Sequence, residues 1–308
     1  MSSQRATAFV PGHVTAFFSA HPADDPAVAG SRGAGVTLTD GVTVRVSATG
    51  GAVDGGAEAA TGGAAVGGAE ATTGGAGETT IDGEPGSIGA VDDVLAELDA
   101  VGADVAVETD LPIGAGFGVS GAAALGAALA ANDAFDRGRS ENELVGIAHA
   151  AEVGRGTGLG DVVAQARGGV PVRLEPGSPG VGALDGVPAT ARVEYVTFGE
   201  LSTEAVLDGD TASLSAAGED ALDRLRADPR LPTLLDAARG FAREADLLVP
   251  EVADAIDAVE TAGGEAAMAM LGRTVFALGT GLSDAGYDPE ACRIDAAGAR
   301  LVDGHGRE

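Results

Sequence analysis

A run of glycines between residues 111 and 121 has the composition of a phosphate-binding loop. The sequence there is LPIGAGFGVSG, with Gly114, Gly116 and Gly118 at alternate positions and Ser120 two residues later. Glycines without a Cβ allow the backbone to approach a ligand closely. The small-residue helix that we expect next begins with unpaired N–H groups and a positive dipole end. Together these features favour an anion, most commonly a nucleotide phosphate. A plain turn into a buried alanine-rich helix is the alternative.

A second glycine-rich turn, GRGTGLG at residues 154–160, lies between two acidic residues. Glu152 precedes it, near the end of a helix expected over 141–153, and Asp161 follows it. His149 lies three residues before Glu152 and therefore on the same face of that helix. Each residue also has a simpler interpretation: Glu152 as a solvated acid, Asp161 as a helix N-cap, and His149 as a buried polar residue.

Phosphoryl transfer uses the kinds of side chain that stand beside these two loops. The reaction needs a cradle for the triphosphate, oxygen ligands for Mg²⁺ and a carboxylate near the attacking hydroxyl. Mg²⁺ prefers few hard oxygen ligands and keeps several waters, and Ser120 and Glu152 supply two such oxygens. Asp161 is then free to accept or orient the hydroxyl proton. The sequence therefore predicts a kinase-type site with Ser120, Glu152 and Asp161 as its catalytic residues.

The first glycine loop resembles the P-x-G-x-G-L-G-S-S-A phosphate loop of the GHMP kinase superfamily, which includes galactose, homoserine, mevalonate and phosphomevalonate kinases. The spacing from Glu152 through a glycine-rich turn to Asp161 is similar to that of the superfamily. Five segments in order, PGHVTAFF, SRGAG, GAGFGVSGAAALG, TGLGDVVAQ and AMLGRTVFAL, resemble the archaeal pantoate kinase family more closely. The resemblance covers nearly the whole chain outside residues 48–86.

The resemblance implies a two-lobed α+β fold, with a ribosomal-S5-like N-terminal lobe, a ferredoxin-like C-terminal lobe and the site between them. It implies transfer of the γ-phosphate of ATP to the 4-hydroxyl of pantoate, on the route to coenzyme A, and a homodimer. By family motif, Ser120 and Glu152 are the metal ligands for Mg²⁺, and Asp161 is the catalytic aspartate. The residues expected to contact ATP are Pro112, Gly114, Ala115, Gly116, Phe117, Gly118, Val119, Ser120 and Gly121.

Pantoate carries a carboxylate, and a site for it usually supplies a cation. In a chain without lysine this cation must be arginine or, as a second choice, histidine. The family motif assigns pantoate contacts to His149, Arg173 and Thr203. We add His13 as a further candidate for substrate binding. A solvated loop histidine is the alternative for His13, and a surface strand charge is the alternative for Arg173.

The sequence departs from the superfamily pattern at two places. Val119 replaces the first serine of the phosphate loop, and the third motif is reduced to Leu-Gly-Arg-Thr at 271–274. Two other functions therefore stay open. One is a GHMP-type kinase for another alcohol, such as a homoserine- or mevalonate-like substrate. The other is a non-catalytic nucleotide-binding protein of the same fold, although such a protein has no need of Asp161.

The composition limits the partners and the surroundings of the protein. The net charge is -29, and all 18 basic residues are arginine. A negative surface of this size argues against nucleic acid or an anionic membrane as a partner. The missing lysine excludes a Walker-type phosphate loop. The acidic excess suggests a salt-rich, halophilic cytoplasm, where screening makes self-repulsion tolerable. No apolar run approaches the length of a membrane span, and no leader is recognisable, so we expect a soluble cytoplasmic protein.

The N-terminal part of the chain combines strand patterns with turn signals. The Pro-Gly pair at 11–12 predicts a turn after a short strand at 6–10, and the small residues at 31–35 predict another. Residues 35–46 alternate apolar and polar positions around an Asp-Gly pair, the pattern of a β-hairpin. Residues 48–86 consist almost wholly of Gly, Ala, Thr, Glu and Asp. We interpret them as an acidic flexible insertion, because they bury too little apolar surface to become ordered.

The rest of the chain mixes helices and strands, as in an α+β fold of two lobes. Ser140 and Glu143 form a capping-box pattern at the start of the helix over 141–153. We place the domain boundary in a Pro-, Gly- and Asp-rich loop at 175–190, which divides the chain into an ATP-binding domain, 1–180, and a C-terminal domain, 181–308. Helices are expected at 91–101, 119–132, 141–153, from 162, and at 211–227, 231–248, 250–262 and 280–286, and strands at 103–107, 170–174, 192–198, 266–271, 274–278 and as a pair near 291–302.

Overall fold

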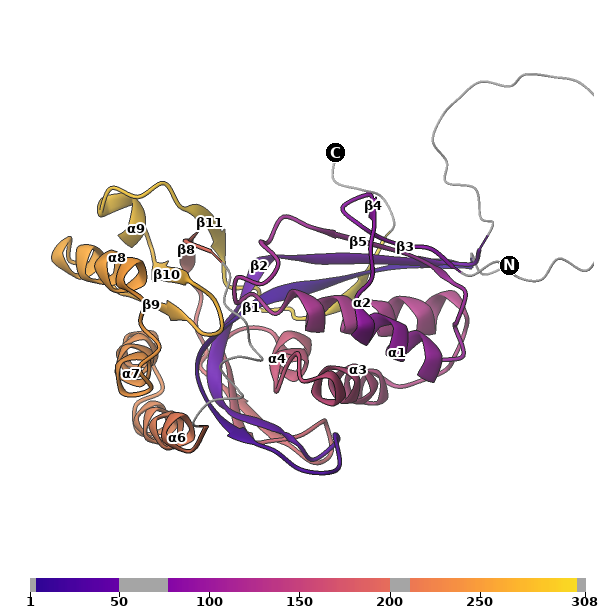
Figure 1. Ribbon diagram of the computed structural model, residues 1–308, viewed down its shortest axis with the longest axis horizontal. Coiled ribbons are helices and arrows are strands. Elements are labelled where there is room, and N and C mark those ends of the chain that lie inside the picture. The colour runs from indigo at the N-terminus through magenta and orange to yellow at the C-terminus, as the bar shows by residue number, and fades with distance from the viewer. Residues whose placement is uncertain (1–3, 50–76, 200–210, 304–308) are drawn as a thin grey trace, which may run out of the picture.

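The computed structural model describes residues 4–49, 77–199 and 211–303 of the 308-residue chain. Within these ranges the chain forms an eight-stranded and a four-stranded sheet with helices packed against them (Figure 1). The elements in chain order are β1 (Arg5–His21), β2 (Gly30–Ser47), β3 (Thr79–Ile81), β4 (Glu84–Pro85), α1 (Gly89–Glu97), β5 (Asp104–Thr109), α2 (Val119–Ala134), α3 (Glu141–Arg155), α4 (Asp161–Arg167), β6 (Pro171–Glu175), β7 (Ala183–Gly186), β8 (Arg192–Thr197), α6 (Thr211–Ala227), α7 (Leu231–Glu244), α8 (Pro250–Thr261), β9 (Ala266–Ala269), β10 (Thr274–Leu278), α9 (Gly281–Asp284), β11 (Glu290–Arg293) and β12 (Arg300–Val302).

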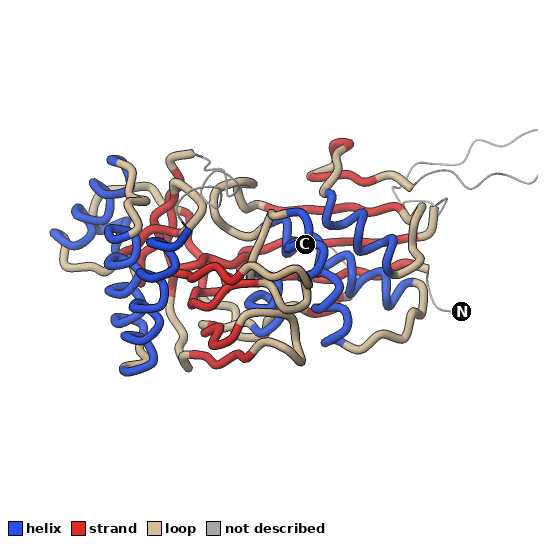
Figure 2. The backbone as a smooth tube through the Cα atoms, turned by 60° about the horizontal axis from the view of Figure 1, so that its bottom comes forward, coloured by secondary structure: helices blue, strands red, loops and turns tan. Residues whose placement is uncertain are grey.

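The larger sheet carries the N-terminal lobe. Its strand order is β12-β1-β2-β5-β3-β4, and β6 joins it through β2 and is followed by β7. Helices α1 to α4 lie on one face of this sheet (Figure 1). The smaller sheet has the order β11-β8-β10-β9, and Figure 2 shows its strands between the C-terminal helices and the first sheet. No helix among the described residues is long and apolar enough to cross a membrane.

The small residues of α2 bring this helix close to the sheet. A Cβ added to Gly126 would approach Cγ2 of Val44 in β2 to 2.5 Å. Alanines fill most of the other positions of α2 that face the core, and the helix is buried along most of its length. The first turn of α2 is therefore held against β1 and β2, which fixes the direction in which its N-terminus points.

The predicted turn at Pro11-Gly12 is wrong, since both residues lie inside β1. The pairing of β1 with β2 shifts register between Pro11 and Gly12 and again between Thr15 and Phe17. Such bulges bend a strand and accept a proline, which cannot donate to the ladder. In Figure 1 the two strands curve past the C-terminal helices toward their connection. Because β1 continues, His13 lies in a buried strand and not in a solvated loop.

The predicted turn at 31–35 and the predicted hairpin at 35–46 are also wrong, because all of these residues belong to β2. The glycines are needed because β1 passes close to them, and not because the chain turns there. A Cβ on Gly33 would lie 2.2 Å from the carbonyl oxygen of Phe17, and one on Gly35 would lie 2.3 Å from Nε2 of His13. The actual hairpin consists of β1 and β2, joined by residues 22–29.

Part of the predicted insertion at 48–86 is ordered sheet. Residues 50–76 lie outside the described residues, but β3 pairs in parallel with β5, and β4 pairs with β3. The prediction missed this because the segment lacks an alternating apolar pattern. The short β7 lies inside the predicted loop at 175–190.

The other predicted helices and strands are present, with small shifts at their ends. The capping box of α3 is confirmed, and this helix continues to Arg155 before Gly156 caps it with φ +69°. Both strands predicted near 291–302 are present, but they do not pair with each other, since β11 pairs with β8 and β12 pairs with β1. The division of the chain near residue 180 stays a prediction.

Candidate active site

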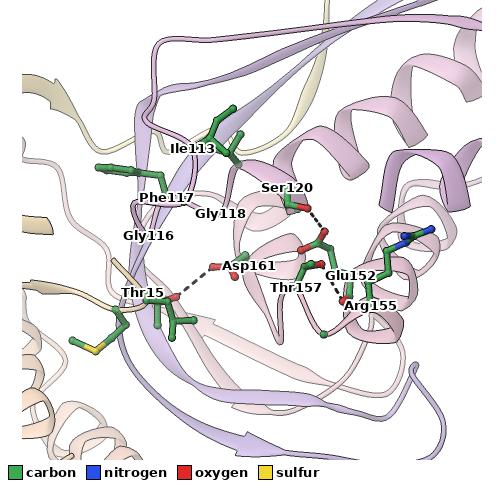
Figure 3. Close-up of a pocket in the computed structure, with 16 residues that line it drawn as sticks. Thr15, Ile113, Gly116, Phe117, Gly118, Ser120, Glu152, Arg155, Thr157 and Asp161 are labelled. Atoms are coloured by element: carbon green, nitrogen blue, oxygen red, sulfur yellow. Dashed lines mark hydrogen bonds between the residues drawn. The ribbon is translucent and has the colours of Figure 1, made fainter. Parts of the chain in front are cut away.

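A cavity of about 600 Å³ lies where the two lobes meet at the phosphate loop. It is lined by the loop that precedes α2, the first turn of α2, the end of α3, the start of α4 and the turn between β9 and β10 (Figure 3). Both glycine-rich loops predicted from the sequence therefore open into the same cavity. Seven of the nine residues predicted to contact ATP line it, whereas Pro112 and Ala115 do not.

The phosphate loop has the backbone conformation that its glycines allow. Gly114, Gly116 and Gly118 have φ values of +78°, +91° and +64°. Gly118 is the N-cap of α2 and makes no side-chain capping bond. The first N–H groups of α2 thus lack the usual side-chain acceptor and are free to bind an anion at the positive end of the helix.

Hydrogen bonds to three carbonyls fix this loop from the protein side. Oγ1 of Thr274 donates to Ala115 O at 2.8 Å, and the backbone N of His13 donates to Phe117 O at 2.9 Å. Nε2 of Gln165 donates to Gly118 O at 2.9 Å. The loop is therefore held in shape before a ligand arrives, which lowers the entropic cost of binding.

Ser120 and Glu152 form a pair of hard oxygen donors at the edge of the cavity. Oγ of Ser120 donates to Oε1 of Glu152 at 2.6 Å (Figure 3). Burial raises the pKa of Glu152, and the hydrogen bond from Ser120 opposes this shift. Among the described residues no group of three His, Cys, Asp or Glu side chains could hold a metal. A serine and a carboxylate nevertheless fit Mg²⁺, which takes few protein ligands and completes its shell with phosphate and water.

Asp161 begins α4, and two side chains from β1 hold its carboxylate. Nδ1 of His13 lies 2.7 Å from Oδ1 of Asp161. Oγ1 of Thr15 donates to the same oxygen at 3.3 Å, as Figure 3 shows. Burial alone would raise the pKa of Asp161, but the hydrogen bonds from His13 and Thr15 and the nearby charge of Arg173 hold it below its ordinary value. Asp161 is therefore a carboxylate at neutral pH.

His13 lies behind Asp161 and is not a lining residue of the cavity. Its side chain is fully buried, so the interpretation as a solvated loop histidine is wrong. Burial lowers the pKa of His13, which keeps the imidazole neutral near pH 7. A neutral imidazole has one N–H, and the 2.7 Å contact places it on Nδ1, where it donates to Asp161. The geometry thus gives His13 a positioning role, and substrate contact by His13 stays a prediction.

Arg173 is buried in β6 with part of its guanidinium unpartnered. The residue is 2% exposed, so the interpretation as a surface charge is wrong. Among the described residues, neither Nε nor Nη1 of Arg173 has a hydrogen-bond partner. Burial lowers the pKa of the guanidinium, and the charge of Asp161 opposes this shift. A buried polar group without a partner is costly, so these donors are suited to an acceptor that comes with a ligand.

The Arg173 side chain lines a second, small cavity beside the first. This cavity has a volume of about 20 Å³, and it shares Thr15, Asp161 and Leu271 with the large one. Such a volume holds about one water-sized group. Gly160 makes room for the arginine, because a Cβ there would lie 2.7 Å from Nε of Arg173. The second glycine loop thus allows a buried cation next to the catalytic carboxylate.

His149, which was also predicted to bind substrate, is not brought to these cavities. Nε2 of His149 bonds the carbonyl of Ala29 at 2.9 Å, and His149 lines neither cavity. Its place fits a buried polar residue that holds the β1–β2 connection, and its contact with pantoate stays a prediction. Thr203 lies outside the described residues.

The reduced third motif forms a turn that packs against the phosphate loop. A Cβ on Gly272 would lie 2.0 Å from Ala115 O, and Met270 N donates to Thr15 O at 2.9 Å. Leu271 lines both cavities. Arg155 also lines the large cavity and pairs with Asp93 at 2.5 Å. Sequence reasoning missed Thr15 and Leu271 as site residues, since only the fold brings them to the glycine loops. It also missed Arg155, although this residue belongs to the second glycine loop.

Comparisons with known proteins agree with this geometry. Residues 87–169 match the family described as GHMP kinases N terminal domain. A pantoate kinase from Thermococcus kodakarensis is 37% identical over 88% of this chain and 86% of that protein. A pantoate kinase from Methanospirillum hungatei is 32% identical over 91% of this chain and 89% of that protein. A solved phosphotransferase related to the CoA biosynthesis pathway superposes with a TM-score of 0.81 at 29% identity, over 98% of this chain and 100% of that one.

Proposed function

Because the chain belongs to the pantoate kinase family of the GHMP kinases, we propose that it transfers the γ-phosphate of ATP to the 4-hydroxyl of pantoate, on the route to coenzyme A. The membership confirms the predicted two-lobed α+β fold and the predicted enzyme class. The observation that supports pantoate most directly is the buried, partly unpartnered guanidinium of Arg173 beside Asp161. The pantoate carboxylate supplies the acceptors that this guanidinium lacks.

Asp161 acts on the reacting hydroxyl in this proposal. Both side-chain hydrogen bonds to Asp161 that the described residues make end on Oδ1. Oδ2 is therefore the oxygen that accepts the proton of the pantoate 4-hydroxyl as this hydroxyl attacks the phosphate. General-base catalysis of this kind contributes roughly 10²–10⁴-fold to the rate.

The phosphate loop and its neighbours bind the nucleotide. The backbone of Gly116 and Gly118 and the first N–H groups of α2 hold the phosphates, and Ser120 and Glu152 hold Mg²⁺. When bound, this ion neutralises negative charge on the phosphates. The hydrogen bond between Ser120 and Glu152 keeps both oxygens together at the rim of the cavity, ready to be shared with the ion. The homodimer implied by the family stays a prediction, which sedimentation at molar KCl would test.

The substrate is tested by ADP release at molar KCl with pantoate, homoserine and mevalonate as acceptors. We expect turnover with pantoate and little with the other two. Turnover with homoserine or mevalonate but not with pantoate would leave only the broader kinase assignment. ATP binding without turnover on any of the three would favour a non-catalytic nucleotide-binding protein.

The role of Arg173 is tested by Arg173→Met, which keeps much of the side-chain volume but removes the charge. A charge-assisted contact contributes about 1.5–3 kcal/mol, so the KM for pantoate should rise about 10- to 150-fold while the KM for ATP stays nearly constant. Arg173→Lys keeps a positive charge but cannot donate two parallel hydrogen bonds to a carboxylate. Its KM for pantoate should therefore lie between those of the wild type and Arg173→Met. Arg167→Met removes a guanidinium at the other end of α4, outside both cavities, and serves as the matched control. A parallel rise of both KM values in Arg173→Met would contradict the assignment.

A further inference from the structure

Leu271 has a left-handed backbone that its residue type does not favour. Its φ is +63°, and it lies in the turn between β9 and β10. The other non-glycine residues with positive φ in the described ranges are all aspartates: Asp82, Asp99, Asp136 and Asp246. Aspartate tolerates this conformation because its short polar side chain can hydrogen-bond locally, whereas a bulky apolar side chain has no such compensation. Glycine would adopt this conformation without strain. The presence of a leucine at this position therefore indicates that its side chain has a role.

The residues on both sides of Leu271 are held in place. Met270 N donates to Thr15 O at 2.9 Å, and Oγ1 of Thr274 donates to Ala115 O at 2.8 Å. Gly272 fits so closely against Ala115 O that a Cβ would lie 2.0 Å from it. The turn is thus fixed between β1 and the phosphate loop. These contacts impose the backbone of Leu271, and strain of this kind is typical of functional sites.

Leu271 lies at the junction of the two cavities. Of the described residues, Thr15, Asp161 and Leu271 alone line both, and Leu271 is the apolar member of the three. If one oxygen of the pantoate carboxylate reaches Arg173 in the small cavity and the 4-hydroxyl reaches Asp161, the carbons C2 to C4 between these groups span this junction. In pantoate, a 2,4-dihydroxy-3,3-dimethylbutanoate, the central carbon C3 carries two methyl groups. Phe18 adds a second apolar side chain to the lining of the small cavity.

We propose that Leu271 determines substrate selectivity by packing against the two methyl groups on C3 of pantoate, the carbon next to the reacting C4. The proposal rests on the proposed function and adds the group that is recognised between the carboxylate and the hydroxyl. One methylene more or less in an apolar pocket changes kcat/KM by roughly 10- to 200-fold. The contact with Leu271 should therefore account for at least about a tenfold preference for pantoate over an unbranched analogue.

The test compares kcat/KM for pantoate with kcat/KM for 2,4-dihydroxybutanoate, which has the same carboxylate and hydroxyls but no methyl groups. In Leu271→Gly the side chain is removed and the backbone strain is relieved, so folding is not impaired, as thermal unfolding would verify. We expect the pantoate preference to fall about tenfold or more, with a nearly constant KM for ATP. Leu271→Met, with a similar volume, should keep the preference. Ile113→Ala, which alters the lining of the large cavity alone, is the matched control.

An unchanged preference in Leu271→Gly would overturn the proposal, and so would an equal loss with both acceptors, because a residue that only supports the phosphate loop affects both alike. If Leu271→Gly is inactive, calorimetric binding of the two acceptors in the presence of a non-hydrolysable ATP analogue replaces the kinetics, and a ratio of dissociation constants equal to that of the wild type overturns the proposal. A wild type that phosphorylates neither acceptor overturns the proposed function itself, whereas a wild type that phosphorylates pantoate without preferring it overturns only the role of Leu271.

Discussion

Replacement of His13 should shift the pH dependence of turnover, because its imidazole is hydrogen-bonded to the catalytic carboxylate. The bond to Oδ1 of Asp161 is 2.7 Å long, and the His13 side chain has no exposed surface. Thr15 and Arg173 also act on Asp161, and the charge of Asp161 in turn raises the pKa of Glu152. His13→Val removes the N–H donor and suits a buried strand. His13→Asn keeps an amide N–H at about the position of Nδ1.

The size of the shift follows from the energy of this one bond. A hydrogen bond to a charged group contributes about 1.5–3 kcal/mol, and about 1.36 kcal/mol corresponds to one pKa unit. Loss of the donor should therefore raise the pKa of Asp161 by about 1–2 units. Since Asp161 must be deprotonated to accept a proton, the acidic limb of the kcat profile should move to higher pH by the same amount. In His13→Asn the limb should stay near that of the wild type.

The assay measures ADP release with pantoate at molar KCl from about pH 3 upward, because the wild-type limb lies below the ordinary pKa of an aspartate, over the range where unfolding controls show the variants folded. Thr15→Val provides a graded comparison, because its hydroxyl makes the longer bond, 3.3 Å, and its loss should shift the limb less. The reasoning is refuted if kcat of His13→Val decreases equally at every pH and its acidic limb coincides with that of the wild type. His13 would then be a packing residue without influence on the carboxylate.

Four further outcomes are expected. Asp161→Asn should lower kcat by roughly 10²–10⁴-fold, and turnover near the wild-type value would contradict its role. Gly116→Ala should raise the KM for ATP far more than that for pantoate, because φ is +91° and the new Cβ would lie 2.9 Å from Met270 O; equal KM values in variant and wild type would refute this. Burial lowers the pKa of His149, so the unfolded chain takes up a proton first as the pH falls below about 6.5, and stability decreases there. As the pH falls, the urea midpoint of unfolding should decrease less in His149→Gln than in the wild type. Transfer from molar to millimolar KCl should unfold a chain of net charge -29, which an unchanged circular-dichroism spectrum would disprove.

Features that depend on neighbouring residues in the sequence could be predicted. The capping box of Ser140 and Glu143 is local, and both of its hydrogen bonds are present in α3. The phosphate loop could be recognised because the spacing of its glycines sets the backbone directly. That Ser120 and Glu152 lie close together could be predicted only because both stand beside a glycine-rich loop of a recognisable family.

Features that depend on distant contacts could not be predicted. Gly33 and Gly35 carry the composition of a turn, yet they are needed because β1 passes close to them. For the same reason the sequence places His13 in a loop. Its hydrogen-bond partner Asp161 lies 148 positions away, so no local pattern indicates the contact. The left-handed backbone of Leu271 is likewise imposed by contacts with β1 and the phosphate loop, and no local pattern in the sequence indicates it.

The pairing of β12 with β1 has a consequence for the synthesis of this protein. Thr7 pairs with Val302 and Phe9 with Arg300, whose guanidinium lies 4.6 Å from the centroid of the Phe9 ring. A ribosome must therefore translate the message through codon 302 before this edge of β1 finds its partner. Until then the strand that carries His13 exposes unpaired N–H and C=O groups, which can pair with another nascent chain. The strand that orients the catalytic carboxylate is thus completed only by the last strand of the described chain.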